Sequence, residues 1–325
     1  MYIQQTFELS LVLDTDKFQQ VLNDNYGTTE RLDDDESIDR SLAPKGITIT
    51  YRDSTYKKKI TLFIKPEWVL DDDEPDPDKL IRKLEKRVDD YFDHRYRLRD
   101  FKISGLSLVS DIDVQDRDRV ASYVKVLQRI GRVKGFTPTR ESWINDDLCF
   151  SLDGNSNGID FAIFDLEGLL RKQLSQAESG RKQLKSMIEK SKGLLRAEVQ
   201  LTEPRAIRSY TDSTDTDDQM AALIENREKV FLDTFMRIVP FGDFLKKDKA
   251  TEIIRAKVSD DRLRRRMLRL LDLIPEKRSL LPALKALNHR NVEEIIRAFN
   301  DIELSPVCIS KRSKVKKLDN IYKFM

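Results

Sequence analysis

The sequence predicts an α+β fold in which two tandem β-α-β units are followed by a helical C-terminal region. Three observations carry this prediction. An alternating strand that ends in aspartate and leads into an amphipathic helix occurs twice, and each copy continues into a hairpin. Beyond residue 219 the strand pattern gives way to helical periodicity. The length of 325 residues is enough for two or three domains.

The first unit is predicted over residues 1–100. Its opening strand, which ends at Asp14, precedes a helical pattern through Phe18, Val21 and Leu22. A hairpin then joins two alternating strands, and a helix and a closing strand follow. We expect these four elements at 47–51, 59–64, 80–91 and 101–108.

The second unit is predicted over residues 101–208 and repeats this order. Its opening strand ends at Asp111, and the helix after it carries Val120, Tyr123, Val124 and Leu127. The later elements are a hairpin, a helix and a strand, expected at 148–152, 159–164, 181–188 and 194–201. The closing strand of the first unit would also open the second. Each unit then has the split, ferredoxin-like β-α-β-β-α-β pattern.

A linker and a basic helical region complete the predicted organisation. Residues 209–219 are rich in Thr, Ser and Asp, which is typical of a linker. Residues 220–325 form the helical region, in which Ser259 is the expected cap of one helix. The last two helices flank Asn288, His289 and Arg290, and they suit either a helix-turn-helix or an ordinary helical hairpin.

Charge is distributed unevenly along the chain, although the formal net charge is only +2. Residues 181–325 contain 32 Lys and Arg against 22 Asp and Glu, a net of +10, and the remainder has 27 against 35, a net of −8. Such an asymmetry suits a C-terminal part that meets a polyanion, although solvated helices can also be rich in Lys and Arg.

Several classes of protein are excluded by composition. No run approaches the roughly 18 apolar residues that span a bilayer, and the start at Met1 lacks the basic and apolar regions of a secretory signal. Cys149 and Cys308 are too few for a disulfide framework or a thiolate metal site. We therefore expect a cytoplasmic protein.

Four acids stand on or beside the predicted strands of the second unit. Asp111 and Asp113 are two apart and share a face, Glu198 lies on a neighbouring strand, and Asp165 follows the hairpin. Carboxylates on one face can hold Mg²⁺ or Mn²⁺ against a phosphate, and Arg196 shares the face of Glu198 and can pair with it or with a phosphate. Alternatively these are solvated strand-end acids, and Asp113 caps the next helix.

Residues 106–210 resemble the core of the rolling-circle replication initiators, with their plasmid, filamentous-phage and conjugative-element relatives. In that family an "I-D-hydrophobic" strand is followed by a Gly/Ser hairpin, an "I-Y-D-K" strand and an "L-R-hydrophobic-E-hydrophobic" strand. The similar segments here are Ile112-Asp113-Val114, Asp153-Gly154-Asn155-Ser156, Ile163-Phe164-Asp165-Leu166 and Leu195-Arg196-Ala197-Glu198-Val199. Each motif is short, and their order makes the combination more specific than any one of them.

The resemblance implies a DNA-nicking enzyme that starts replication. A tyrosine hydroxyl would attack a DNA phosphodiester, helped by a metal that acids hold. Phe164 occupies the tyrosine position of the family and Leu166 the lysine position, and the paired histidines of many nicking enzymes are absent. Tyr210, after the Glu198 strand, and Tyr123 are the remaining candidates for the nucleophile, and Tyr123 shares a helix face that is predicted to be core.

Two basic clusters are predicted to bind DNA phosphates through salt-dependent contacts. They consist of Arg262, Arg264, Arg265, Arg266 and Arg269, and of Lys311, Arg312, Lys314, Lys316 and Lys317. The interpretation is an initiator that binds and nicks its origin, with a host helicase as a further partner. The alternatives are a catalytically inactive DNA-binding or scaffold protein, and a protein whose basic face binds another protein.

Overall fold

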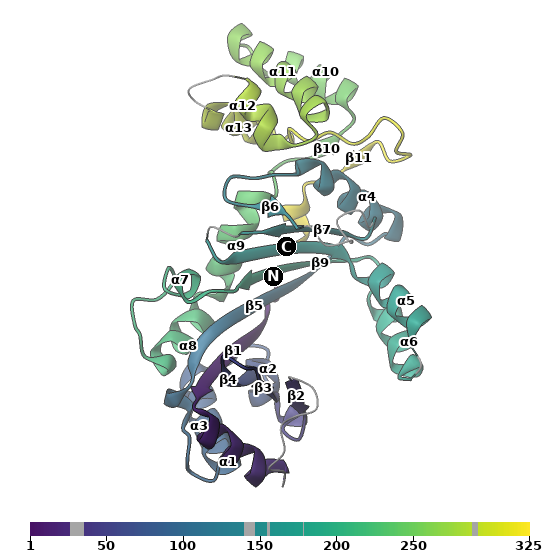
Figure 1. Cartoon of the computed structure of the whole chain (residues 1–325). Coiled ribbons are helices and arrows are strands. Elements are labelled where there is room, and N and C mark those ends of the chain that lie inside the picture. Colours follow the sequence, from purple (N-terminus) through teal and green to yellow (C-terminus); the bar gives the residue numbers. More distant parts are fainter. Residues whose placement is uncertain (27–35, 140–146, 155–156, 178, 288–291) are drawn as a thin grey trace.

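The fold is built on one antiparallel sheet of nine strands (Figure 1). This computed structural model describes residues 1–26, 36–139, 147–154, 157–177, 179–287 and 292–325. Within that part of the chain the strand order is β2-β3-β4-β1-β5-β9-β8-β7-β6, and every neighbouring pair is antiparallel. The predicted α+β class is confirmed.

The first half of the sheet contains a split β-α-β connection. Helix α1 and the short edge strand β2 connect β1 to β3, and β4 lies between β1 and β3, so the two connected strands are not neighbours. Strand β5 pairs with β1 on one side and with β9 on the other, and it is therefore common to both halves. The elements are β1 (Gln4–Leu13), α1 (Thr15–Tyr26), β2 (Glu36–Asp39), β3 (Ile47–Asp53), β4 (Lys58–Ile64), α2 (Pro66–Leu70), α3 (Pro77–Tyr91) and β5 (Lys102–Asp113).

The second half has a different strand order, so the prediction of two ferredoxin-like units is not confirmed. Strands β8 and β9 are direct antiparallel neighbours, and β9 lies between β8 and β5. The chain leaves β8 through α5 and returns through α6, and such a helical hairpin brings the next strand back beside the previous one. The elements are α4 (Arg117–Leu127), β6 (Thr137–Pro138), β7 (Cys149–Asp153), β8 (Ile159–Asp165), α5 (Leu166–Gln176), α6 (Arg181–Lys190) and β9 (Leu194–Leu201).

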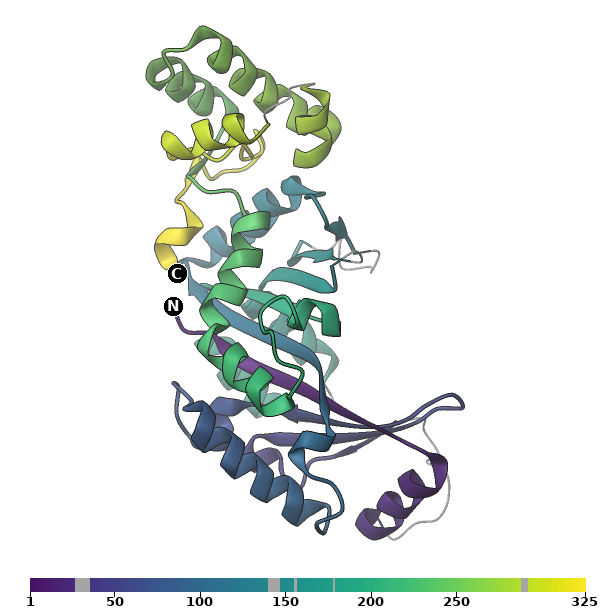
Figure 2. The same cartoon turned by 90° about the vertical axis from the view of Figure 1, so that its left-hand side faces the viewer.

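The C-terminal part is mainly helical, and two of its helices belong to the layer that covers the sheet. Figure 2 shows α8 and α9 lying along the sheet, whereas α10 to α13 form a lobe beyond its end. The segment predicted as a linker, 209–219, enters α8, where the Thr216 hydroxyl donates to the Phe101 carbonyl at 2.7 Å. The elements are α7 (Pro204–Ile207), α8 (Thr216–Glu225), α9 (Arg227–Ile238), β10 (Phe244–Leu245), α10 (Lys247–Lys257), α11 (Asp261–Lys277), α12 (Leu280–Ala286), α13 (Val292–Asp301) and β11 (Lys317–Leu318).

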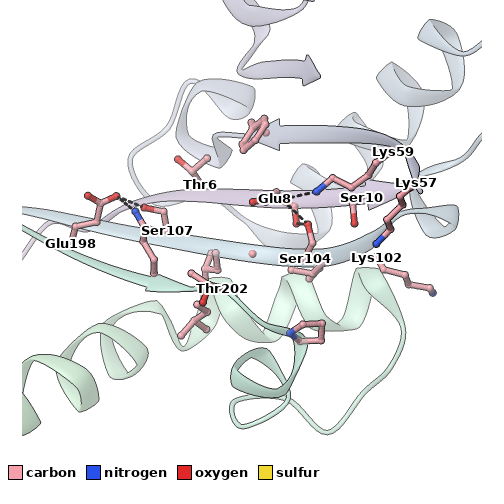
Figure 3. Close-up of a pocket in the computed structure, with 17 residues that line it drawn as sticks. Thr6, Glu8, Ser10, Lys57, Lys59, Lys102, Ser104, Ser107, Glu198 and Thr202 are labelled. Carbon is pink, nitrogen blue, oxygen red and sulfur yellow. Dashed lines mark hydrogen bonds and ion pairs between the residues drawn. The ribbon is translucent and has the colours of Figure 1, made fainter. Parts of the chain in front are cut away.

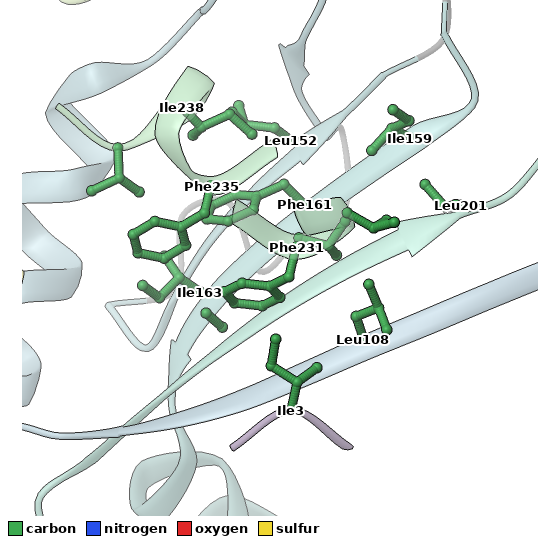
Figure 4. Close-up of a cluster of buried hydrophobic side chains, with 14 of the residues drawn as sticks. Ile3, Leu108, Leu152, Ile159, Phe161, Ile163, Leu201, Phe231, Phe235 and Ile238 are labelled. Atoms are coloured by element: carbon green, nitrogen blue, oxygen red, sulfur yellow. The ribbon is translucent and has the colours of Figure 1, made fainter. Parts of the chain in front are cut away.

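One face of the sheet is buried under helices because every second side chain of its strands is apolar. Under α9, Phe235 stacks on Phe231 with ring centroids 5.7 Å apart and meets Phe161 of β8 at 6.0 Å (Figure 4). In the first half, Tyr51 of β3 meets both α1 and α3, through Phe18 and Tyr91. The helices of both halves therefore lie on the same side of the sheet.

Aspartates cap several helices through side-chain acceptance of backbone N–H groups. Asp260, and not the predicted Ser259, caps α11: its carboxylate accepts from the backbone nitrogens of Arg262 at 2.7 Å and Leu263 at 2.9 Å. These two hydrogen bonds lower the pKa of Asp260. Likewise Asp116, and not Asp113, caps α4.

No helix in the described ranges is both long enough and apolar enough to cross a bilayer. The predicted turn at Asn288, His289 and Arg290 lies outside the described residues.

Candidate nucleic-acid interface

The face of the sheet opposite the helices is hollowed into a polar groove over β1, β4, β5 and β9. The groove has a volume of about 640 Å³ and opens to solvent (Figure 3). Its side chains occupy the strand positions that alternate with the buried ones, so the same alternation builds the core and the groove. The polar lining is Thr6, Glu8, Ser10, Lys57, Lys59, Lys102, Ser104, Ser107, Glu198, Gln200 and Thr202.

Hydrogen bonds within the polar groove hold its two carboxylates. Glu8 accepts from Ser104 Oγ at 3.0 Å and pairs with Lys59 Nζ at 3.3 Å. Glu198 accepts from Ser107 Oγ at 2.9 Å and from Gln200 Nε2 at 2.8 Å. Both carboxylates therefore have hydrogen-bond donors on the same or an adjacent strand.

Cations gather at the β4 end of the polar groove. Lys57 and Lys102 are exposed, and neither forms an ion pair with a described residue. Tyr56, beside Lys57 in the turn between β3 and β4, is 98% exposed. These residues are not among those predicted to bind DNA. The sequence signal for Lys57 is the run Tyr56-Lys57-Lys58-Lys59 in a predicted hairpin.

Three of the four segments that carry the resemblance lie at β5, β8 and β9, which are neighbouring strands of the sheet. The fourth segment includes Asn155 and Ser156, which lie outside the described residues. Asp111 of β5 is opposite Arg196 of β9, and Arg196 is opposite Phe164 of β8. Arg196 donates to Asp111 from Nε at 2.6 Å and from Nη2 at 2.7 Å, a bidentate pair that raises the pKa of Arg196. We call Asp111, Arg196 and Phe164 the motif row. The guanidinium of Arg196 is held by Asp111, beside the end of the polar groove at Glu198.

The four acids predicted to bind a metal do not meet at one point. Asp111 and Glu198 share the face of the polar groove, and Asp113 accepts from the Gln115 backbone nitrogen at 2.8 Å in a tight turn. Asp165 points to the opposite, buried face, where it caps α5 by accepting from Gly168 N at 2.9 Å. In the ranges that the structure describes, no group of three or more His, Cys, Asp or Glu could hold a metal ion. The residues present therefore do not fit the Mg²⁺ or Mn²⁺ centre expected from the resemblance.

The two candidate tyrosines also lie away from the motif row. Tyr123 is fully buried in the helical layer and donates to the Asp319 carbonyl at 2.7 Å, and burial raises the pKa of Tyr123. Tyr210 is half-buried against α9, near Thr234, and burial raises the pKa of Tyr210 as well. Neither hydroxyl reaches the polar groove in this arrangement. Phe164, which has no hydroxyl, is the aromatic residue that borders Arg196.

The arginines of α11 form a basic face. Arg262, Arg265 and Arg269 are exposed and Arg266 is partly exposed, whereas the buried residues of α11 are Met267, Leu270, Leu271, Leu273 and Ile274. Arg264 lies at the edge and pairs with Asp261. By contrast, Arg262, Arg266 and Arg269 form no ion pair with a described residue. Arg262 and Arg269 are exposed, so their charges face solvent, and Arg266 is partly exposed.

The C-terminal basic cluster is only partly available. Lys317 is committed to two carboxylates, Asp243 at 2.8 Å and Asp319 at 3.1 Å. The other predicted residues are exposed and form no ion pair within the described chain: Lys311, Arg312, Lys314 and Lys316. Four of the five predicted cations can thus meet a ligand.

Asp165 gives a prediction about stability. We expect Asp165→Ala to lower the free energy of unfolding by about 1 kcal/mol, because the cap of α5 is lost. Asp165→Asn keeps an acceptor for Gly168 N and should equal or exceed the wild type at neutral pH. Burial, with Glu167 close by, raises the pKa of Asp165 against the opposing charge of Arg117. A raised carboxyl pKa means that the charged form is disfavoured in the fold, so the advantage of Asn should shrink as pH falls through that pKa.

Urea unfolding of both variants at neutral and mildly acidic pH measures this effect. An Asn variant as unstable as the Ala variant, or an advantage that grows toward acid, would contradict the assignment.

The comparisons with known proteins give no family. No family model matches the chain, and no curated protein matches it. Among solved structures, a rolling circle replication initiator protein from Geobacillus stearothermophilus is similar at 12% sequence identity and a TM-score of 0.29. The match covers 96% of this chain and 100% of that one. This TM-score is too low to establish a common fold.

Proposed function

We propose that this protein binds DNA in replication initiation and that α11 is its main phosphate-binding element. The observation that carries the proposal is the basic face of α11, on which Arg262 and Arg269 are exposed, Arg266 is partly exposed, and none of the three forms an ion pair with a described residue. Arginine recognises phosphate with a planar fork of donors, and several arginines on one helix face match a run of phosphates.

The polar groove supports the proposal as a second contact surface. Its hydroxyl and amide groups suit hydrogen bonds to sugar and phosphate oxygens, and Lys57 and Lys102 supply positive charge at one end. Tyr56 beside them offers an exposed ring on which a base of a single strand can stack.

The link to replication initiation rests on the motif row. Three of the four short segments that carry the resemblance lie at β5, β9 and β8, three adjacent strands. Asp111, which directly precedes the first of these segments, is in register with Arg196 and Phe164.

Nicking is a second candidate, favoured by the placement of Asp111 and Glu198 on the same face. However, Arg196 holds Asp111, Phe164 stands where a nucleophile would be needed, and Tyr123 and Tyr210 lie elsewhere. DNA binding without tyrosine transesterification therefore fits the geometry better, and we assign no step to a metal.

Salt-dependent binding tests the proposal. Fluorescence anisotropy with labelled duplex and single-stranded oligonucleotides should show affinity falling at least about tenfold between low and moderate salt. In parallel, supercoiled and single-stranded DNA with Mg²⁺ or Mn²⁺ should give neither nicked product nor a covalent protein–DNA adduct. Absence of any DNA binding would overturn the proposed function. A covalent tyrosine–DNA adduct would instead support the nicking hypothesis.

A further inference from the structure

A second cavity lies far from the motif row, where α9, α12 and α13 meet the turn before β6. We call it the apolar groove; its volume is about 540 Å³. Its apolar lining includes Met236, Leu280, Leu281, Leu284, Val292 and Ile296. Met236 is 58% exposed, although its neighbours Phe235 and Ile238 are buried. The other five apolar residues are partly exposed. Apolar side chains that gather at the surface of a groove indicate a site that another molecule covers.

Hydrogen bonds join two of the segments that line the apolar groove and fix their relative position. Arg132 N donates to Ser279 Oγ at 2.7 Å, and Leu281 N donates to the Arg132 carbonyl at 3.3 Å. Gly131, at a φ of +60°, makes this approach possible, because a Cβ there would lie 2.7 Å from Ser279 Oγ. Two segments almost 150 residues apart in sequence are thereby fixed beside each other.

Cations surround the apolar groove. The lining includes four basic residues, Arg132, Lys134, Arg237 and Lys285, against one acid, Glu293. The guanidinium carbon of Arg237 lies 5.2 Å from the ring centroid of Phe136, which orients that charge. Lys134 and Lys285 are exposed and form no ion pair with a described residue.

We propose that the apolar groove binds an acidic amphipathic helix of a partner protein. Aliphatic walls from three helices suit apolar side chains at positions i, i+3 or i+4, and i+7, as in other helix-in-groove complexes. The cations at the rim complement Asp or Glu on the flanks of such a helix. DNA is the poorer occupant, because aliphatic side chains offer nothing to phosphates. The contact is independent of the DNA-binding surfaces and extends beyond the proposed function.

Binding of synthetic peptides tests this proposal. The probe is a fluorescein-labelled helical peptide with Leu at i, i+3 and i+7 and Glu on its flanks; one control has Lys in place of Glu, and another has Ser in place of Leu. We expect the acidic peptide to bind at least about tenfold tighter than either control, a difference of about 1.4 kcal/mol. Equal binding of the acidic and basic peptides, or no binding of either, would overturn the proposal.

Variants locate the binding site. Lys134→Glu/Lys285→Glu should weaken the acidic peptide at least about tenfold and improve the Lys peptide, and Met236→Gln should weaken both Leu-containing peptides. Lys182→Glu/Lys190→Glu on α6 makes the same charge change elsewhere and should leave binding unchanged. Displacement of the peptide by duplex DNA would assign the apolar groove to DNA. A protein dimer that dissociates in the Lys134→Glu/Lys285→Glu variant would assign it to a second copy of the chain. Either result would overturn the proposal.

Discussion

Reversing the charge of Arg262, Arg266 and Arg269 together is expected to weaken DNA binding by about 100-fold or more at low salt. The side chains of Arg262 and Arg269 are exposed and that of Arg266 is partly exposed. None of the three forms an ion pair with a described residue, so each can contact a phosphate. Each lost contact removes a counterion-release contribution, and the slope of log affinity against log salt should fall by about three. Anisotropy titrations of the Arg→Glu triple variant across a salt series measure both quantities.

The control separates local contact from net charge. Lys182→Glu, Lys185→Glu and Lys190→Glu together change the formal charge by the same amount on α6, a helix of the α5–α6 hairpin. This control should lose only a small part of the affinity and keep the salt slope. If both triple variants weaken binding equally, the protein attracts DNA by overall charge alone, and α11 has no special role. Circular dichroism of each variant checks that α11 remains folded.

Local patterns in the sequence were sufficient to predict most strands of the fold. The alternation of apolar and polar residues around Asp111, Ile163 and Glu198 identifies β5, β8 and β9. In a sheet with one buried face, every second side chain of a strand points into the core. The same alternation predicts that Asp111 and Asp113 share a face, and in β5 both are exposed while Ile112 between them is buried. These features depend only on residues close together in the chain.

Strand pairing could not be predicted in the same way, because it depends on contacts between distant residues. The segment between β8 and β9 forms two helices instead of the one predicted at 181–188, and this hairpin places β9 beside β8. Asp165 shows the consequence for the site: one position beyond Phe164, the side chain turns to the buried face, away from Asp111. The motif row became visible only when the registers were known.

The C-terminal region shows a related effect. Helical periodicity identifies α9 and α11, but it does not say against which surface each helix packs. Phe231 and Phe235 of α9 cover the sheet, whereas α11 belongs to the lobe beyond it (Figures 1 and 4). The net charge of residues 181–325 therefore averages over α9, which packs on the sheet, and α11, which exposes arginines.

Phe235→Ala is expected to lower the free energy of unfolding by about 3–5 kcal/mol. Phe235 is fully buried and its ring meets Phe161, Phe231 and Tyr322, with centroids 6.0, 5.7 and 5.4 Å away. The loss would be a large fraction of the roughly 5–15 kcal/mol that stabilises a typical domain.

Met236→Ala is the matched control, since the next residue of the same helix is 58% exposed and should change stability by less than about 1 kcal/mol. Urea denaturation followed by tryptophan fluorescence and circular dichroism compares the two variants. A single transition that shifts for Phe235→Ala alone is expected if α9 and the sheet unfold together. Equal shifts for both variants would contradict the buried position of Phe235. A sheet transition that Phe235→Ala leaves unchanged would mean that α9 unfolds separately from the sheet.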